Sequence, residues 1–195
     1  MLTRKGAEIH DESGAKVERT IVKSTASAQL VDKGNHKHFM AKEIHEQPEV
    51  VGHTLAHYID MVNERVALPG KLPFDWTKLK RLSISACGTA FYAGLVAKYW
   101  FERFAKLPVE IDIASEFRYR GAPLEAGDLA LFISQSRETA DTLATLRYAR
   151  ENKQHILAVV NVPTSTIARE SDVVMPTLAG PEIGVASTKA FTGQL

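Results

Sequence analysis

The sequence is poor in cysteine, in long apolar runs and in charge of one sign. A single cysteine excludes a disulfide framework, and without an apolar run or a basic-then-apolar leader nothing predicts membrane insertion or export. Lys and Arg total 24 against 23 Asp and Glu, so no basic surplus predicts nucleic-acid binding. We therefore expect a cytoplasmic protein with neither a membrane nor a nucleic acid as partner.

The first part of the 195-residue chain is polar and rich in turns. Residues 8–22, EIHDESGAKVERTIV, predict a hairpin whose short strands lie around Asp11 to Lys16, with Ser13-Gly14 as its turn. Residues 33–59 predict one or two helices, interrupted near Pro48. Six apolar residues there follow helical spacing: Phe39, Met40, Ile44, Val51, Leu55 and Ile59.

After Lys80, short apolar runs alternate with helical segments. The expected strands are RLSISA, VEIDI, DLALFI, HILAVV and DVVMP. The expected helices cover about 89–105 and 136–152, and a third begins near Ser187. This alternation predicts βαβ units and a mostly parallel sheet with helices on both faces. The third helix would stop at Leu195 without a polar cap, which suggests truncation.

Three loops are candidates for ligand binding, because ligands of an open parallel sheet bind beyond the carboxyl ends of its strands. In the first loop, SACGTAF, Gly88 and Thr89 offer backbone N–H groups and a hydroxyl to an anion. Small residues there also suit a tight turn from strand to helix, so both interpretations stay open.

The second loop, SQSRETADT, places the hydroxyls of Ser134, Ser136 and Thr139 around a helix start, as a phosphate site would. The alternative is simple capping of the helix by Ser136. Arg137 stands where such loops usually have glycine. It either obstructs the loop or adds a charged donor to an anion.

The third loop, EIGVASTKAF, has Ser187 and Thr188 at a helix start, followed by Lys189. The default expectation for such a lysine is a solvated side chain.

Metal binding is not expected. The pairs His36/His38 and His53/His57 have ligand-like spacing, but no third ligand is evident and the glutamate of the zincin motif is missing. Cys87 has no evident base and is expected to be a small buried thiol.

Six segments together resemble the isomerase half of the glucosamine-6-phosphate synthase family. They are KEIHEQP, CGTAFYAG, ASEFRYR, SQSRETADTLA, NVPTSTIARESD and PEIGVASTKAFTGQL, and the likeness runs from about His38 to Leu195. The resemblance implies that residues 38–195 are the first of two sugar isomerase (SIS) domains, a flavodoxin-like α/β/α sandwich with a mostly parallel sheet. Residues 1–37, with the hairpin, are similar to the end of the glutaminase domain and the linker.

The resemblance also implies which residues bind a phosphosugar, either fructose 6-phosphate or glucosamine 6-phosphate. The implied site residues are Thr89, Ala90, Ser134, Gln135, Ser136, Thr139, Val185, Ala186 and Ser187. Two residues depart from the family pattern: Arg137 replaces a glycine and is a candidate modulator, and Ala90 replaces a serine. A lost hydrogen bond to a charged group costs about 1.5 to 3 kcal/mol, so weakened binding is expected.

The family's reaction makes glucosamine 6-phosphate from fructose 6-phosphate and glutamine without a cofactor. This chain lacks the glutaminase nucleophile and the second SIS domain, so we expect binding but no activity of the isolated chain. The expected partner is a second copy or a full-length synthase subunit. Two alternatives stay open: a non-catalytic phosphosugar-sensing or subunit-pairing module, and a decayed product without a ligand.

Overall fold

The structure is a computed structural model that describes residues 2–3, 6–19, 32–68, 72–135 and 140–195. The chain divides into two compact units, Met1–Leu30 and Val31–Leu195, which are described separately below.

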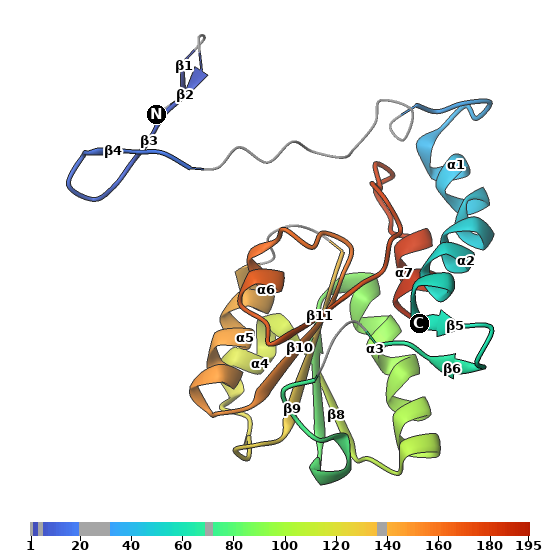
Figure 1. Cartoon of the computed structure of the whole chain (residues 1–195), viewed down its shortest axis with the longest axis vertical. Helices are drawn as coiled ribbons and strands as arrows, with labels where there is room; N and C mark the ends of the chain where they lie inside the picture. Colours follow the sequence, from blue (N-terminus) through green and yellow to red (C-terminus); the bar gives the residue numbers. More distant parts are fainter. Residues whose placement is uncertain (1, 4–5, 20–31, 69–71, 136–139) are drawn as a thin grey trace. The chain divides into compact units, whose positions relative to one another are not determined.

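The first unit consists of two small antiparallel pairs of strands (Figure 1). Strand β1 (Leu2–Thr3) pairs with β2 (Gly6–Ala7), and β3 (Ile9–His10) pairs with β4 (Lys16–Val17). Asp11 closes the turn between β3 and β4, because its Oδ1 accepts hydrogen bonds from the backbone N–H groups of Ser13 and Ala15 at 2.9 and 3.0 Å. The predicted hairpin is confirmed.

The second unit begins with two consecutive helices, α1 (Phe39–His45) and α2 (Gln47–Tyr58). They meet just before Pro48, as predicted, because proline is tolerated only in the first turn of a helix. The apolar spacing did not mark the buried side: Leu55 is half exposed, whereas Val50 and Thr54 are buried. A short hairpin follows, formed by β5 (Ile59–Asp60) and β6 (Arg65–Val66), which the sequence analysis did not predict.

Five parallel strands form the central sheet of this unit. They are β7 (Leu82–Ala86), β8 (Val109–Ile113), β9 (Leu129–Ser134), β10 (His155–Val160) and β11 (Val173–Pro176). Their spatial order is β11-β10-β9-β7-β8, which is the flavodoxin-like order of a doubly wound sheet. The predicted fold class and the position of each strand are confirmed.

Helices cover both faces of the sheet (Figure 1). On one face lie α3 (Gly88–Trp100), extended by a π-helical turn (Phe101–Ala105), and α7 (Lys189–Gln194). On the other lie α4 (Ala114–Arg120), α5 (Ala140–Glu151) and α6 (Thr166–Arg169). The sequence analysis missed α4, α6 and a single 3-10 turn (Trp76–Lys78), which are too short to show a clear period.

The core consists of two apolar layers, one on each face of the sheet. Leu82, Ile84 and Leu131 belong to the layer under α3, and Phe132, Leu146 and Ile156 belong to the layer under α5 and α6. Helix α3 approaches the sheet closely at Gly94, where an added Cβ would lie 2.7 Å from the Cδ1 atom of Ile111. The loops that follow β7 and β9 therefore begin on strands that are packed on both faces.

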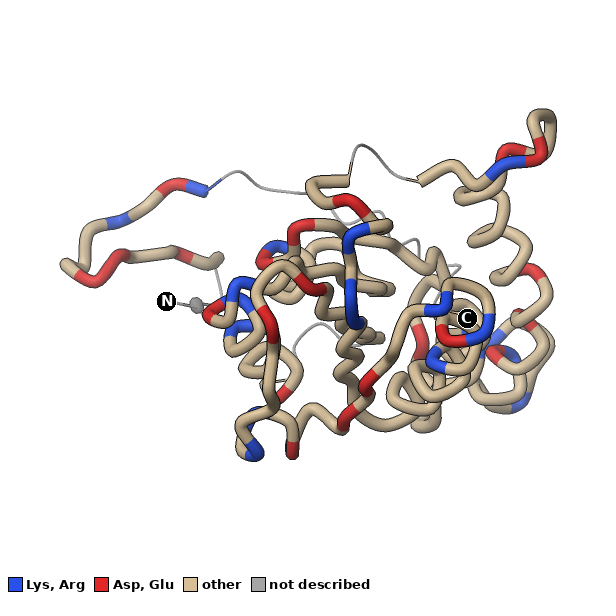
Figure 2. The backbone as a smooth tube through the Cα atoms, turned by 90° about the horizontal axis from the view of Figure 1, so that it is seen from below, with Lys and Arg blue, Asp and Glu red and all other residues tan. Residues whose placement is uncertain are grey.

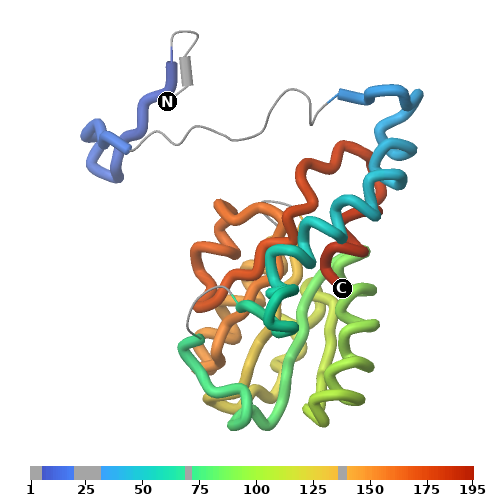
Figure 3. The backbone as a smooth tube through the Cα atoms, turned by 45° about the vertical axis from the view of Figure 1, so that its right-hand side comes forward, coloured from blue at the N-terminus to red at the C-terminus, as the bar shows by residue number. Residues whose placement is uncertain are grey.

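Helix α2 runs beside the last helix, α7 (Figure 3). The hydroxyl of Tyr58 donates to the carbonyl of Pro176, the last residue of β11, and the hydroxyl of Thr54 donates to the carbonyl of Thr177, the next residue. Burial raises the pKa of Tyr58 to about 12. These contacts bring the start of the second unit to the end of the chain.

No helix in the described ranges is long and apolar enough to cross a membrane. Positive and negative residues are interspersed along the described chain (Figure 2), in line with the nearly equal numbers of the two charges.

Candidate functional site

A cavity of about 310 Å³ lies at the carboxyl ends of the central strands, where the chain leaves β7 and β9. These two strands are neighbours and form the point where the strand order reverses, which is where doubly wound sheets bind ligands. Three segments far apart in sequence line the cavity: Cys87, Gly88, Thr89, Ala90; Ile133, Ser134, Gln135, Thr142; Glu182, Gly184, Val185, Ser187.

The first segment leads from β7 into α3. Gly88 has a φ of +58°, a left-handed conformation that glycine adopts without strain, so the backbone favours glycine here. The side chain of Cys87, the N-cap residue of α3, forms no capping hydrogen bond within the described ranges; Thr89 is exposed and Ala90 is buried beneath it. Cys87 is half-buried and lines the cavity, so the prediction that its thiol is buried is wrong.

The second segment leads from β9 toward α5. Ser134 is buried at the end of β9, and Thr142, which the resemblance did not single out, is buried and also lines the cavity. The side-chain Oε1 of Gln135 is buried and has no hydrogen-bond partner within the part of the chain that the structure describes. Ser136, Arg137 and Thr139 lie outside the described residues, and their roles stay predictions.

The third segment, residues 182–187, is called the wall segment below. Val185 is exposed at the rim of the cavity, and Ala186 is not among the lining residues. The hydroxyl of Ser187 donates to Glu182 at 2.6 Å. The same carboxylate accepts the backbone N–H of Thr188 at 2.7 Å and therefore caps α7. Glu182 was missed because nothing local marks a carboxylate seven residues before the first residue of α7 as a cap.

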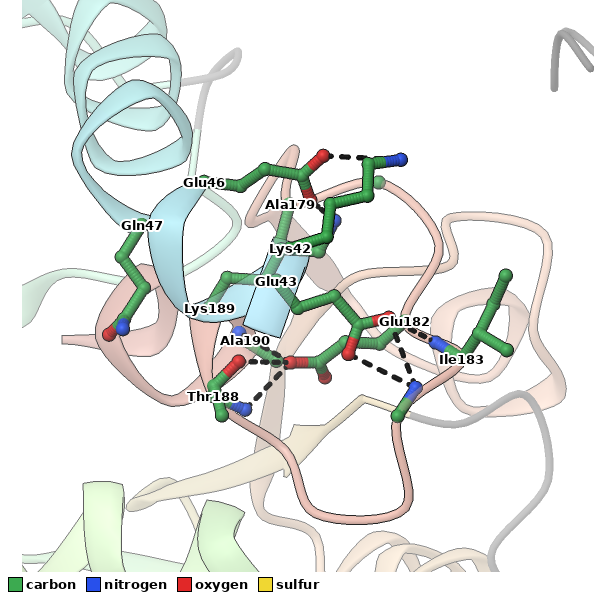
Figure 4. A network of polar contacts seen from close by, with 12 residues as sticks. Lys42, Glu43, Glu46, Gln47, Ala179, Glu182, Ile183, Thr188, Lys189 and Ala190 are labelled. Carbon is green, nitrogen blue, oxygen red and sulfur yellow. Dashed lines mark hydrogen bonds and ion pairs between the residues drawn. The ribbon is translucent and has the colours of Figure 1, made fainter. Parts of the chain in front are cut away.

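Just beyond the wall segment, Lys189 at the start of α7 forms an ion pair with Glu46, the residue that follows α1 (Figure 4). The ammonium of Lys189, only 5% exposed, lies 2.8 Å from Glu46. The expectation of a solvated Lys189 is therefore wrong, because α1 and α2 cover the start of α7. Burial raises the pKa of Glu46, but the ammonium groups of Lys189 and Lys42 lower it more, so it lies below its usual value.

A second carboxylate of α1 reaches the wall segment directly. Glu43 is 2% exposed, and its Oε1 accepts the backbone N–H of Ile183 at 2.6 Å (Figure 4). Both of its oxygens lie 3.0 Å from the backbone nitrogen of Gly184. The sequence analysis used KEIHEQP only as a mark of resemblance and did not predict this contact.

The histidine pairs do not assemble a metal site among the described residues, where no group of three metal-ligating side chains occurs. His53 and His57 are both exposed on α2.

Comparison with known proteins places the fold and this cavity in context. The model of the SIS domain family matches residues 77–195. The whole chain is 71% identical to a glutamine–fructose-6-phosphate aminotransferase (isomerizing) of Bradyrhizobium diazoefficiens and 65% identical to one of Mesorhizobium japonicum. It covers 32% of each, so it spans about a third of the length of these relatives.

Among solved structures, the C-terminal domain of glucosamine-fructose-6-phosphate aminotransferase from Francisella tularensis is similar in fold and sequence. It superposes with a TM-score of 0.76 at 45% identity, over 84% of this chain and 46% of that one.

Proposed function

Since this chain belongs to the SIS domain family, we propose that residues 38–195 form a phosphosugar-binding domain. The ligand is fructose 6-phosphate or glucosamine 6-phosphate, and residues 1–37 correspond to the end of a glutaminase domain and the linker. The observation that carries this proposal is the cavity at the reversal of strand order, because all three loops singled out in the sequence line it.

The lining residues suit a sugar phosphate. The hydroxyls of Ser134 and Thr142 and the backbone N–H groups at the start of α3 offer donors to a phosphate dianion, and a helix N-terminus favours negative charge. In this proposal Ser134, with Ser136 and Thr139, binds the phosphate. The buried amide oxygen of Gln135 accepts a hydrogen bond from a sugar hydroxyl. Thr89 and Ala90 border the phosphate, and Val185, Ala186 and Ser187 surround the sugar.

The isolated chain binds its ligand without converting it. Opening and isomerising a sugar requires an acid and a base within hydrogen-bond reach of the substrate. Among the described lining residues the titratable side chains are Cys87 and Glu182, and the carboxylate of Glu182 is already bonded to Ser187 and Thr188. No cofactor is part of the proposal. In this proposal, the synthesis of glucosamine 6-phosphate requires a protein as long as the relatives, of which this chain covers about a third.

Subunit pairing is a second candidate function, favoured by the exposed aromatic side of α3 and its π-helical extension. Tyr92, Tyr99 and Phe104 are 61%, 67% and 72% exposed, and Trp100 lines an apolar cavity of about 480 Å³ beside them. Burying such surface would favour association with a second copy or with a full-length synthase subunit. Size-exclusion chromatography with light scattering tests this, and a monomer at micromolar concentration contradicts it.

Calorimetric titration tests the phosphosugar proposal. We expect heat of binding with fructose 6-phosphate and glucosamine 6-phosphate, and none with fructose. Ser134→Ala removes a phosphate donor and should weaken binding at least about tenfold. The control is Ser171→Ala, because that hydroxyl donates to the Ile167 carbonyl at the end of α6, away from the lining residues. Equal titrations with fructose and its phosphate would contradict the proposal.

The same titration with Arg137→Gly assigns the role of the arginine. Tighter binding by the variant means that the side chain obstructs the phosphate, and weaker binding means that it contributes a donor.

A further inference from the structure

We propose that Glu43 is a positioning residue of the phosphosugar site, through which helix α1 fixes one wall of the cavity. The inference rests on the proposed function of that cavity. Glu43 does not line the cavity; it acts through the backbone of the wall segment, residues 182–187.

The contact is built as a specific bond and is not a chance approach of two surfaces. The carboxylate is almost completely buried, yet its bonded partners in the described chain are the backbone N–H groups of Ile183 and Gly184. Burial of a carboxylate is unfavourable unless hydrogen bonds replace its water. Donors on a loop about 140 residues away provide that replacement, so the position of the loop and the burial of Glu43 depend on each other.

The fit around Gly184 shows how closely the carboxylate controls the wall. A Cβ at this position would lie 2.4 Å from Oε2 of Glu43 and 3.4 Å from the Cα atom of Met40. Gly184 also lines the cavity. One side of this backbone therefore contacts α1 while the residue borders the ligand space, and a shift of α1 would change the shape of that space.

The carboxylates of Glu43, in α1, and of Glu46, which directly follows α1, hold the wall segment near its two ends. Glu43 and Glu46 are three residues apart and so lie on neighbouring positions of one helical face. Glu43 binds the amides of Ile183 and Gly184, and Glu46 binds the ammonium of Lys189 just beyond the segment (Figure 4). The loop between these points, which contains the proposed sugar-binding residues Val185 to Ser187, is thus clamped at both ends.

The matched pair Glu43→Gln and Asp128→Asn separates positioning from general stability. Asp128 is 7% exposed and also accepts two backbone N–H groups, those of Lys80 and Arg81, at 2.9 and 3.2 Å. It lies at the amino ends of β7 and β9, opposite the cavity. Each variant replaces a buried carboxylate by an amide that keeps one acceptor oxygen and turns the other into a donor.

We expect Glu43→Gln to weaken fructose 6-phosphate binding about tenfold in a calorimetric titration. Asp128→Asn should lower the melting temperature to a similar extent and leave the affinity within about twofold of the unmodified chain. Hydrogen exchange at the amides of Ile183 and Gly184 should accelerate in Glu43→Gln and stay unchanged in Asp128→Asn.

Unchanged affinity in Glu43→Gln, with binding intact in the unmodified chain, overturns the inference and leaves the proposed function standing. Equal losses of affinity in both variants overturn it too, because they indicate a general effect on folding. An unmodified chain that does not bind at all overturns the proposed function itself, and with it the role of Glu43 in the site. The exchange measurement then still reports whether Glu43 holds the wall.

A second set of variants tests the coupling directly. Gly184→Ala forces the carboxylate away from the wall, so it should weaken binding about as much as Glu43→Ala. The double variant should then lose little more than either single variant, because both changes break the same contact. Losses that simply add would contradict the inference.

Discussion

The two ends of the parallel sheet are built on the same strands but use their polar groups differently. At the amino ends, Asp128 joins the turn before β9 to the backbone before β7, and the Gly127 N–H donates to the Lys153 carbonyl at 2.9 Å. These bonds join the turn before β9 to the residues before β7 and to the turn before β10. At the carboxyl ends, the loops instead surround a cavity of about 310 Å³.

The carboxyl end requires support from outside the sheet. Its wall segment is held by Glu43 and by the Glu46–Lys189 pair, which belong to a helical pair at the start of the second unit. No contacts cross an open cavity. The hydrogen bonds that hold its wall segment therefore come from residues on the side of the segment that faces away from the cavity. The contacts of Glu43 and Glu46 therefore hold the loop beside the cavity as well as the fold.

The largest effect that separates the two ends is expected for their ion pairs. Glu46→Ala leaves the buried Lys189 without its partner and should lower the free energy of unfolding by about 3 kcal/mol. Glu110→Ala, at the other end, breaks half-exposed pairs with Arg81 and Arg120 and should cost less than about 1 kcal/mol. Urea unfolding measures both. Similar losses would mean that the ends are held alike.

A pair of glycines in the left-handed conformation gives the next largest effect. Gly88 lines the cavity with a φ of +58°, and Gly127 lies at the amino end with a φ of +87°. An added Cβ would meet no described atom within 4 Å at either position, so alanine should cost about 1 to 2 kcal/mol of stability in both places through backbone strain.

Only Gly88→Ala should also weaken binding of fructose 6-phosphate, because Gly88 is the first residue of α3 and lines the cavity. Thermal melts and titrations of both variants check this expectation. A loss of affinity in Gly127→Ala would break the comparison, since it would couple the amino end to the site.

A smaller gain is expected from Ala90→Ser. Ala90 is buried under the cavity in the first turn of α3, and a hydroxyl there adds one donor to the proposed phosphate shell. One such bond to a charged group contributes at least about 1.5 kcal/mol, or roughly tenfold in affinity. Ala149→Ser, buried in α5 beneath the sheet, is the control and should lower stability without tightening binding. No gain from Ala90→Ser would place the phosphate elsewhere in the cavity.

The smallest effect is a dependence of stability on pH. The pKa of Glu46 lies below the usual 4.5 in the folded chain, because Lys189 and Lys42 outweigh its burial. Its contribution is complete above about pH 4.5 and is lost as the pH falls through the lower, folded value. The stability difference between the unmodified chain and Glu46→Ala should therefore shrink below about pH 4.5 in urea unfolding. A constant difference would contradict the ion pair.

Much of the fold was predictable because its signals are local. The five strands are short apolar runs, and the break at Pro48 follows from the chemistry of proline. Helices α4 and α6 were missed because four to seven residues show no reliable period. The burial of Val50 and Thr54 in place of Leu55 was missed because the buried side of α2 is set by the carbonyls after β11 and by α7.

The candidate site was predictable loop by loop but not as an assembly. The loops after β7 and β9, and the segment before α7, stood out by their hydroxyls and glycines, and the structure brings them to one cavity. The roles of Ser136, Arg137 and Thr139 stay predictions, as does phosphosugar binding itself.

The sequence by itself determined the alternation of strands and helices, the parallel sheet and the positions of its polar loops, because each depends on neighbouring residues. Only the tertiary structure decided that Lys189 is buried, that Glu182 caps α7 and that Glu43 holds Gly184. The pairs Glu43–Gly184 and Glu46–Lys189 join residues more than 140 positions apart, and neither partner carries a local sign of the other. Their energies arise from burial that the packed chain alone creates.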